Sequence, residues 1–198
     1  MKQSNRIFLS VMAIVGGLLV VMLMFGGWWI STNNRINNQQ QDVEQQWSQV
    51  ENVMQRRYDL VPNLTAAVKG SMHQEQKVFG NIAKARSAYN SANTPKEKMQ
   101  ADSQLNKSTS MLINVIHENY PKLASNENVK NLMVQLEGSE NRISVERQNY
   151  IATIRAYNQT VINFPSSIVA QAKGAHTLDY FKATTTQVQN APKVNLDN

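Results

Sequence analysis

The 198-residue sequence has no cysteine, and it has only eight glycines and five prolines. The absence of cysteine excludes disulfide frameworks, cysteine-based zinc sites and thiol nucleophiles. Beyond residue 31 four glycines remain, and this supply of turn-forming residues is too small for a protein of many short strands. Apolar residues recur there at helical spacing. The sequence therefore predicts an all-α protein with long helices.

Charge is also scarce, since charged residues make up 17% of the chain, and the net charge is +6. Polarity comes mainly from 23 Asn and 18 Gln residues. Without Lys2 and Arg6, 18 basic residues face 14 acidic ones, and no RNA- or DNA-binding motif accompanies this excess. We expect no nucleic-acid partner.

One long hydrophobic run stands at the N-terminus. Residues 7–30 include 19 hydrophobic residues in 24 and no charge. As a helix this run is about 36 Å long, enough to cross a hydrocarbon core of about 30 Å. It exceeds the apolar core of a signal peptide, and Trp28 and Trp29 at its end suit a membrane interface. The run predicts an uncleaved transmembrane helix.

The charges around this run predict its orientation. Lys2, Arg6 and the terminal amine precede it, and only Arg35 follows closely, so the positive-inside rule places the N-terminus in the cytoplasm. The prediction is a single-pass protein of the cytoplasmic (inner) membrane with an extracytoplasmic, periplasmic domain. We expect a cytoplasmic N-terminus at 1–6, a span at 7–30, a helical domain at 31–183 and a disordered tail at 184–198.

The helical domain is expected to be an antiparallel bundle. Its first helix should continue out of the membrane until Pro62 kinks or breaks it, with a helical pattern then reaching about Tyr89. Thr94, Pro95 and Glu97 form a helix start, and Tyr120-Pro121 a stop. Asn126 should open the longest helix and Ser166 or Ser167 cap a short last one. The expected buried positions have coiled-coil-like spacing: Val43, Trp47, Val50, Met54, Arg57, Val61; Leu64, Val68, Met72, Phe79, Ile82; Met99, Asp102, Leu105, Thr109, Leu112, Ile116; Val129, Leu132, Leu136, Ile143, Arg147, Tyr150, Ile154, Tyr157, Val161, Phe164.

Charged residues interrupt these apolar faces. Arg57, Asp102 and Arg147 lie on them, and Glu140 lies seven residues before Arg147. A buried charge must be paired, because an unpaired one costs several kcal/mol. We therefore hypothesise a polar layer inside the bundle, in which Asp102, Glu140 or Asp59 satisfies the two arginines. Its role is open between holding the helices in register and binding a ligand.

Four ordered motifs around these residues are similar to those of the LemA family. The motifs are Arg56-Arg57-Tyr58-Asp59-Leu60-Val61-Pro62-Asn63-Leu64, Tyr120-Pro121-Lys122-Leu123, Glu140-Asn141-Arg142-Ile143 with Arg147, and Tyr157-Asn158 with Phe164-Pro165. The N-terminal span and Tyr180-Phe181 also agree, and the resemblance covers about residues 33–182. It implies a membrane-anchored bundle of long helices. It also implies a membrane-protein partner, such as a metalloprotease-like neighbour, without implying a reaction.

No motif for chemistry accompanies the resemblance. His73, His117 and His176 are isolated, and phosphate-binding loops and nucleophile elbows are absent. We expect no metal or cofactor, no enzymatic activity, and a role in binding an envelope protein or a second copy. Trp47 is either a contact for such a partner or part of the core. One alternative is an enzyme or binder of a small anionic ligand at a polar cluster of Arg57, Asp59, Asn63, Asp102, Glu140 and Arg147. Another is an organiser of anionic lipid surfaces.

Overall fold

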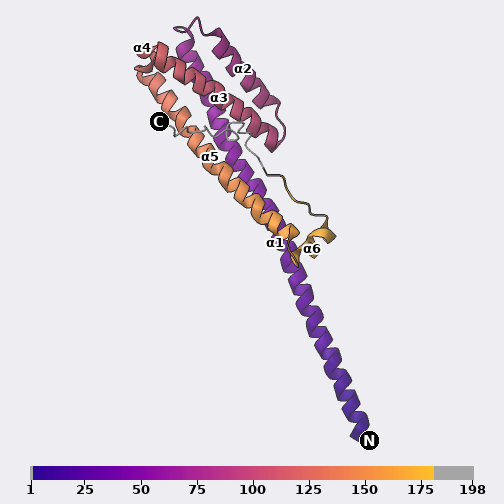
Figure 1. Ribbon diagram of the computed structural model, residues 1–198. Helices are drawn as coiled ribbons and strands as arrows, with labels where there is room; N and C mark the ends of the chain where they lie inside the picture. The colour runs from indigo at the N-terminus through magenta and orange to yellow at the C-terminus, as the bar shows by residue number, and fades with distance from the viewer. Residues whose placement is uncertain (1, 181–198) are drawn as a thin grey trace, which may run out of the picture.

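The computed structural model describes residues 2–180, and this part of the chain is helical with no strand (Figure 1). The helices are α1 (Lys2–Lys69), α2 (Gln76–Ser91), α3 (Pro95–Asn119), α4 (Pro121–Ala124), α5 (Glu127–Ile162) and α6 (Ser166–Lys173). The prediction of an all-α fold with a long apolar N-terminal helix is confirmed.

Helix α1 carries the apolar run directly into the bundle without an interruption. Between residues 12 and 25 its large apolar side chains are 47–75% exposed, and nothing in the described chain covers them. An 18-residue window of the helix has a mean hydropathy of 2.1. So long an exposed apolar surface is unfavourable in water and suits lipid. The N-terminal part of α1 therefore has the length and composition of a membrane anchor.

A break at Pro62 was one of the two outcomes expected there, and it is wrong. Helix α1 continues through this proline to Lys69. A proline inside a helix costs about 3 kcal/mol, but Val61, Leu64 and Val68 are buried around it, and their packing offsets that cost. The helix ends instead before Gly70, and α2 begins at Gln76. The expected continuous helical pattern from 64 to about 89 is thus interrupted by a turn.

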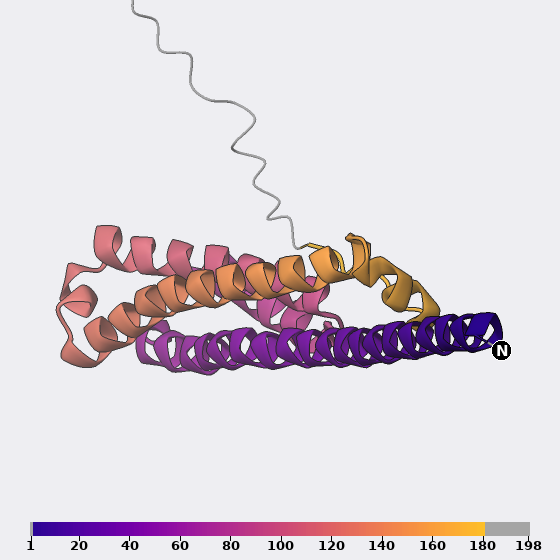
Figure 2. The same cartoon turned by 90° about the horizontal axis from the view of Figure 1, so that it is seen from below.

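The helices alternate in direction, as Figure 1 shows: α1 ascends, α2 descends, α3 ascends and α5 descends beside α1. Helix α1 packs mainly on α5, and α2 mainly on α3. Helices α2 and α3 are shorter and cover only the distal part of the long α1–α5 pair. Figure 2 shows α6 folding back onto α1 near the lower end of α5. The result is a bundle at the distal end, farthest from the N-terminus, and a narrower part toward the N-terminus. We call this narrower part, which consists of α1, the C-terminal part of α5 and α6, the stem.

Most predicted helix ends are confirmed. Thr94 caps α3 through a capping box with Glu97, and the side chain of Asn126 caps α5 by accepting from Asn128 and Val129. Helix α6 exists, but its N-cap is Pro165 and no side chain caps it, so the expected serine cap is wrong. Gly174 ends α6 with a φ of 72°, a conformation that glycine adopts without strain.

Two positions expected on the buried face of α5 are misplaced. Phe164 lies beyond the end of the helix and is 82% exposed, because Asn163 already has an extended backbone. Leu132 is only half-buried, and its neighbour Met133 takes the core position. Trp47 belongs to the core, where its ring lies 5.5 Å from that of Tyr150. The expected tail at 184–198 and Phe181 lie outside the described residues.

The core divides into two apolar clusters along the bundle. The proximal core includes Ile36, Val43, Val50 and Met54 of α1 with Ile143, Tyr150, Ile154, Tyr157 and Val161 of α5. The distal core includes Val61, Leu64 and Val68 of α1, Val78, Ile82 and Ala85 of α2, Leu105, Leu112, Ile113 and Ile116 of α3, and Val129, Met133 and Leu136 of α5. Helix α3 also contributes Met99 and Ala101 to the proximal core. Along α1, α3 and α5 the residues of the two cores are separated by a buried polar residue, which is Arg57, Asp102 and Ser139 respectively.

Candidate functional site

The polar residues between the two cores form one connected layer. Arg57 of α1 donates from Nη1 to Asp102 Oδ2 of α3 at 3.1 Å, and Arg147 of α5 donates from Nη2 to the same oxygen at 2.7 Å. Arg57 also pairs through Nη2 with Glu140. Arg57 is 1% exposed and Asp102 0%. Arg57, Asp102 and Glu140 each lie at the turn between the proximal and distal core residues of their helix, and Arg147 lies two turns beyond Glu140 on α5. The prediction that Asp102, Glu140 or Asp59 satisfies the two arginines is confirmed for Asp102, which pairs with both, and for Glu140, which pairs with Arg57.

Ser139 completes this layer, and the sequence reasoning missed it. Its hydroxyl accepts from Arg57 Nε at 3.2 Å and donates to the carbonyl of Leu136 at 2.6 Å. The signal was available, since Ser139 lies three residues after Leu136 and four before Ile143, both of which are buried. We call Arg57, Asp102, Ser139, Glu140 and Arg147 the central polar layer.

Asp102 is the most buried charge of this layer. Burial raises the pKa of its carboxyl above the usual range, and the charge of Glu140 adds to the rise, whereas Arg57 and Arg147 oppose it. Its second oxygen, Oδ1, is buried without a hydrogen-bond partner. The desolvation of this carboxylate thus outweighs its attraction to two guanidinium groups. Within this layer Arg57 and Arg147 are already paired with carboxylates of the chain.

Two of the six predicted cluster residues do not join the layer. Asp59 is exposed and accepts a hydrogen bond from Gln55 Nε2 of the same helix at 2.9 Å. Asn63 is exposed one turn further along. Both lie on the face of α1 opposite the core, because the helical repeat turns them away from Arg57. The layer meets solvent mainly at Glu140, whose side chain is 40% exposed at a groove of about 240 Å³ that Arg57 also lines, and to a smaller extent at Arg147, which is 16% exposed.

A stack of rings and cations lies beside the layer on α1, α2 and α3. The rings of Tyr58 and Tyr89 lie 5.1 Å apart, Arg86 covers Tyr58 at 4.5 Å, and Lys98 Nζ covers Tyr89 at 4.4 Å. Burial raises the pKa of the Tyr89 hydroxyl. These contacts extend the polar layer to α2, which otherwise carries no member of it. The stack holds α2 and α3 against α1 at this level.

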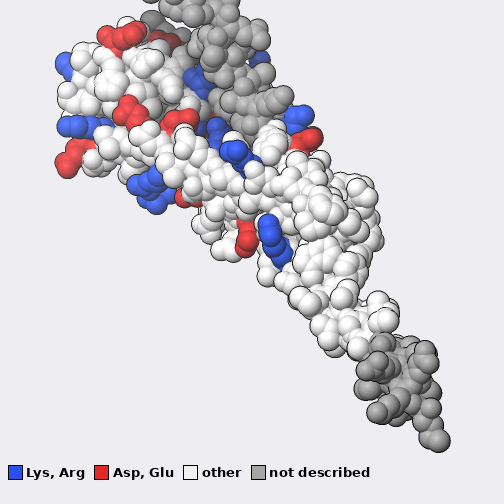
Figure 3. Space-filling model, turned by 60° about the horizontal axis from the view of Figure 1, so that its bottom comes forward, with Lys and Arg blue, Asp and Glu red and all other residues white. Residues whose placement is uncertain are grey.

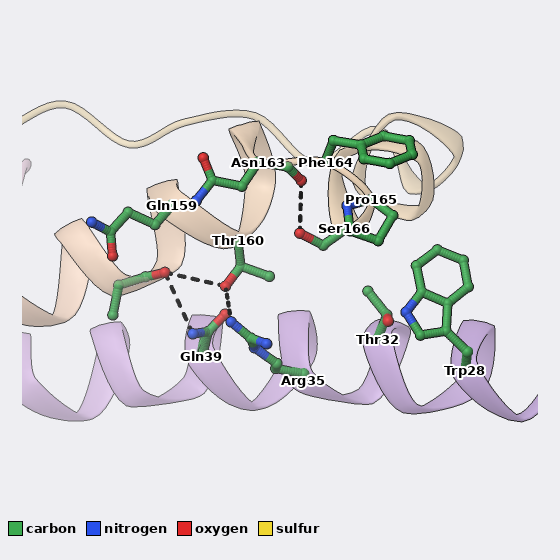
Figure 4. A pocket seen from close by; sticks show the side chains of 11 residues that line it. Trp28, Thr32, Arg35, Gln39, Gln159, Thr160, Asn163, Phe164, Pro165 and Ser166 are labelled. Carbon is green, nitrogen blue, oxygen red and sulfur yellow. Dashed lines mark hydrogen bonds between the residues drawn. The ribbon is translucent and has the colours of Figure 1, made fainter.

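A second polar site, which the sequence did not predict, lies in the stem. It is a pocket of about 360 Å³ between α1 and the junction of α5 with α6 (Figure 4). We call it the stem pocket. Its walls are Trp28, Thr32, Arg35 and Gln39 from α1, Ala156, Gln159 and Thr160 from α5, and Asn163, Phe164, Pro165 and Ser166 from the junction. None of these residues is acidic.

Arg35 and Gln39 tie the two walls of the stem pocket together. Arg35 Nη2 donates to Thr160 Oγ1 at 3.0 Å, and Gln39 Nε2 donates to the carbonyl of Ala156 at 3.4 Å. The amide oxygen of Gln39 is buried and has no donor. No carboxylate within the described chain pairs with Arg35. This pocket therefore presents a cation and an unused acceptor where the central polar layer presents closed pairs.

The C-terminal segment is held against α5 by one buried amide. Asn158 Nδ2 donates to the carbonyl of Leu178 at 2.8 Å, and its Oδ1 accepts from the Leu178 amide at 2.8 Å. Asn158 is buried, so it satisfies both its own amide and an extended backbone at once. This contact gives the Tyr157-Asn158 motif a structural reason. It also returns the chain after α6 toward the bundle.

The comparison with protein families decides the relationship that the motifs suggest. The LemA family model matches residues 46–196, which is most of the chain. The chain belongs to the LemA family. The matched region of this LemA protein contains the whole central polar layer and Asn158. The α1 wall of the stem pocket, from Trp28 to Gln39, precedes the matched region.

The search of curated proteins returned no match to this LemA protein. Among the described residues no group of three or more His, Cys, Asp or Glu side chains could hold a metal ion. The geometry thus provides three elements for a functional reading: the anchor-like start of α1, the central polar layer and the stem pocket.

Proposed function

We propose that this LemA protein is a non-catalytic, single-pass protein of the cytoplasmic (inner) membrane whose bundle binds another envelope protein or a second copy of itself. The observation that carries the proposal is the continuity of α1 from the apolar run to Lys69. About 39 residues follow position 30 in this helix, so it extends roughly 58 Å beyond the anchor. Because α1 packs on α5 along this length, we expect this part of α1 to be rigid and to hold a binding surface at a fixed distance from the membrane.

The surface offered for binding is a stripe of uncharged amides on the outer face of α1. Its members are Asn34, Asn38, Gln41, Gln45, Gln49 and Asn52, all of them exposed. They recur every three or four residues, so they lie in one row opposite Ile36, Val43 and Val50 of the core. Neutral amides cost less to desolvate than charges and can pair with one another. The amide stripe is therefore suited to a helix-to-helix contact.

The proposed orientation places the bundle outside the cytoplasm, since Lys2 and Arg6 precede the anchor. A reporter fused after residue 198 tests this. An enzyme active only outside the cytoplasm should work in the fusion, and an enzyme active only inside should not. The opposite pattern would place the bundle in the cytoplasm and exclude envelope partners.

The partner is tested by photo-crosslinking in intact membranes. A photoreactive residue at Gln45 should give one defined adduct, either the dimer or a complex with one membrane protein, and a metalloprotease-like neighbour is the first candidate. The matched control is Asn114, an exposed amide on α3 away from the amide stripe. No adduct at Gln45, or the same adducts at both positions, would contradict the proposal.

Fewer observations favour the alternative, in which the predicted cluster binds a small anionic ligand. Asp102 already accepts from both arginines, and Asp59 and Asn63 point away. Such a ligand would have to displace Asp102 from two buried guanidinium groups. Calorimetric titration of the full chain with phosphate and small carboxylates tests this alternative. Saturable binding that Arg57→Met abolishes would favour it, and no binding would favour the closed layer.

A further inference from the structure

The stem pocket lies where the exposed apolar part of α1 ends. Trp28 lines it, and Ile30 just beyond is still exposed. Arg35 is seven residues after Trp28, which is about 10 Å along the helix. The polar headgroup region is about 5–7 Å thick on each side of the hydrocarbon core. Figure 4 shows the guanidinium of Arg35 directed toward Thr160 and Gln39, on the side away from Trp28. It therefore lies at the outer edge of the headgroup region, where the polar end of a lipid headgroup can reach the pocket.

The chemistry of this pocket fits a phosphodiester. Arg35 supplies a guanidinium that donates a hydrogen bond to the hydroxyl of Thr160, and the walls contain no carboxylate. Gln39 supplies a buried carbonyl oxygen that lacks a donor. An anionic group with a neighbouring hydroxyl would satisfy both. The glycerol-phosphate headgroup of phosphatidylglycerol has these two groups on one molecule.

The rim of the pocket suits the lipid that carries such a headgroup. Phe164 is 82% exposed and Ile162 is 62% exposed at the end of α5, and Ile168 is exposed on α6. Phe164 lines the same pocket as Trp28, which places this corner at the level of the interfacial tryptophan (Figure 4). On the face in Figure 3, charged side chains gather over the distal bundle and become sparse toward the N-terminal end of the stem. An aromatic ring in this position is suited to the membrane interface.

We propose that the stem pocket binds the headgroup of an anionic phospholipid from the membrane that α1 crosses, while Phe164 rests in the interface beside it. The corner between α5 and α6 would thus be a second membrane contact that fixes the tilt of α1 relative to the membrane. This inference rests on the proposed membrane anchor, because without it the pocket would face water.

Depth measurement in nanodiscs tests the contact directly. The chain has no cysteine, so single spin labels can be placed without background. Labels at Phe164→Cys, at Leu23→Cys in the apolar run and at Val134→Cys on the distal part of α5 compare three exposed positions. We expect oxygen accessibility to be highest at 23, intermediate at 164 and lowest at 134, with the reverse order for a water-soluble nickel chelate.

A label at 164 as open to the nickel chelate as the label at 134, while 23 is shielded, would overturn the lipid contact and leave the anchor standing. A label at 23 that is open to the chelate would overturn the anchor, and the lipid site with it. The two failures are therefore distinguishable.

Lipid retention tests the role of Arg35. The full chain, purified in mild detergent with phosphatidylglycerol, should retain this lipid in native mass spectra, and Arg35→Gln should lower the retained fraction by about tenfold, since hydrogen bonds to charged groups are of that strength. Arg142→Gln, an exposed arginine in the middle of α5, is the matched control and should retain the lipid. Equal retention by both variants would overturn the assignment. Displacement of the lipid by millimolar inorganic phosphate would instead show a site for a soluble ion, which also overturns it.

Discussion

Two arginines of one helix occupy opposite environments in this LemA protein. Arg35 and Arg57 are 22 residues apart (57 minus 35), about six turns, so they lie on nearly the same face of α1. Arg57 is enclosed by Asp102, Ser139 and Glu140 between two apolar cores. Arg35 lies at an open pocket with a threonine and no carboxylate. The same residue type thus holds the fold together at one level and remains able to receive a ligand at another.

The largest effect is expected from Arg57→Ala. It removes the largest fully buried side chain and leaves Asp102 with one arginine, so the unfolding free energy should fall by about 3–5 kcal/mol. Urea unfolding of the full chain in detergent, followed by circular dichroism, measures it. The exposed neighbour Arg56→Ala should change stability by no more than about 0.5 kcal/mol. A loss below 1 kcal/mol for Arg57→Ala would contradict the closed layer.

Replacing the charges together sharpens the same comparison. The triple variant Arg57→Met, Asp102→Leu, Arg147→Met leaves no stranded charge among the three, so it should recover the wild-type stability or exceed it by about 1–4 kcal/mol. The same urea titration measures it. If crosslinking at Gln45 is also unchanged, the layer serves the fold alone. Loss of the adduct in a well-folded triple variant would give the layer a binding role.

Asn158→Ala should have an intermediate effect. Both hydrogen bonds to Leu178 are lost, and at about 1 kcal/mol each the cost is about 2 kcal/mol. Hydrogen exchange at the Leu178 amide should accelerate, and limited proteolysis should cut near this residue. Asn131→Ala, an exposed asparagine of the same helix, is the control. Unchanged exchange at Leu178 would mean that other contacts hold the segment.

A smaller effect is expected from pH. Because the folded pKa of Asp102 is raised, the folded chain binds more protons there than the unfolded chain, and the stability contributed by this group falls as pH rises above about 3.9. Arg57 lowers this pKa, so its removal raises the pKa further. The stability lost in Arg57→Ala should therefore be smaller in acid than at neutral pH. Urea titrations of both chains between pH 4 and 7 test the sign, and a loss that grows in acid would refute it.

The smallest effect on stability is expected from Arg35→Gln. The variant loses one partly buried hydrogen bond, to Thr160, so the unfolding free energy should change by no more than about 1 kcal/mol, although lipid retention falls. The urea titration used for Arg57→Ala gives a direct comparison. A loss of 3 kcal/mol or more would make Arg35 a structural residue like Arg57, and the contrast between the two sites would disappear.

The sequence predicted much of this fold because the relevant signals are local. The capping box at Thr94, the cap at Asn126 and the charges of Arg57, Asp102 and Arg147 on apolar faces all depend on residues within one helix. The prediction of a helix break at Pro62 was wrong because the burial of Val61 and Leu64 outweighs the local free-energy cost of a proline inside a helix. Ser139 joined the central polar layer, and Arg86 joined the stack of rings beside it, through contacts with other helices.

What the sequence by itself determined is the apolar run, the helical class and the need to pair three buried charges, because periodicity and the cost of desolvation act on each helix separately. Tertiary structure alone decided which carboxylate each arginine receives. It also brought Phe164 beside Trp28 to form the stem pocket. Those outcomes depend on how α5 and α6 pack on α1, and no residue pattern within a single helix specifies the position of one helix relative to another.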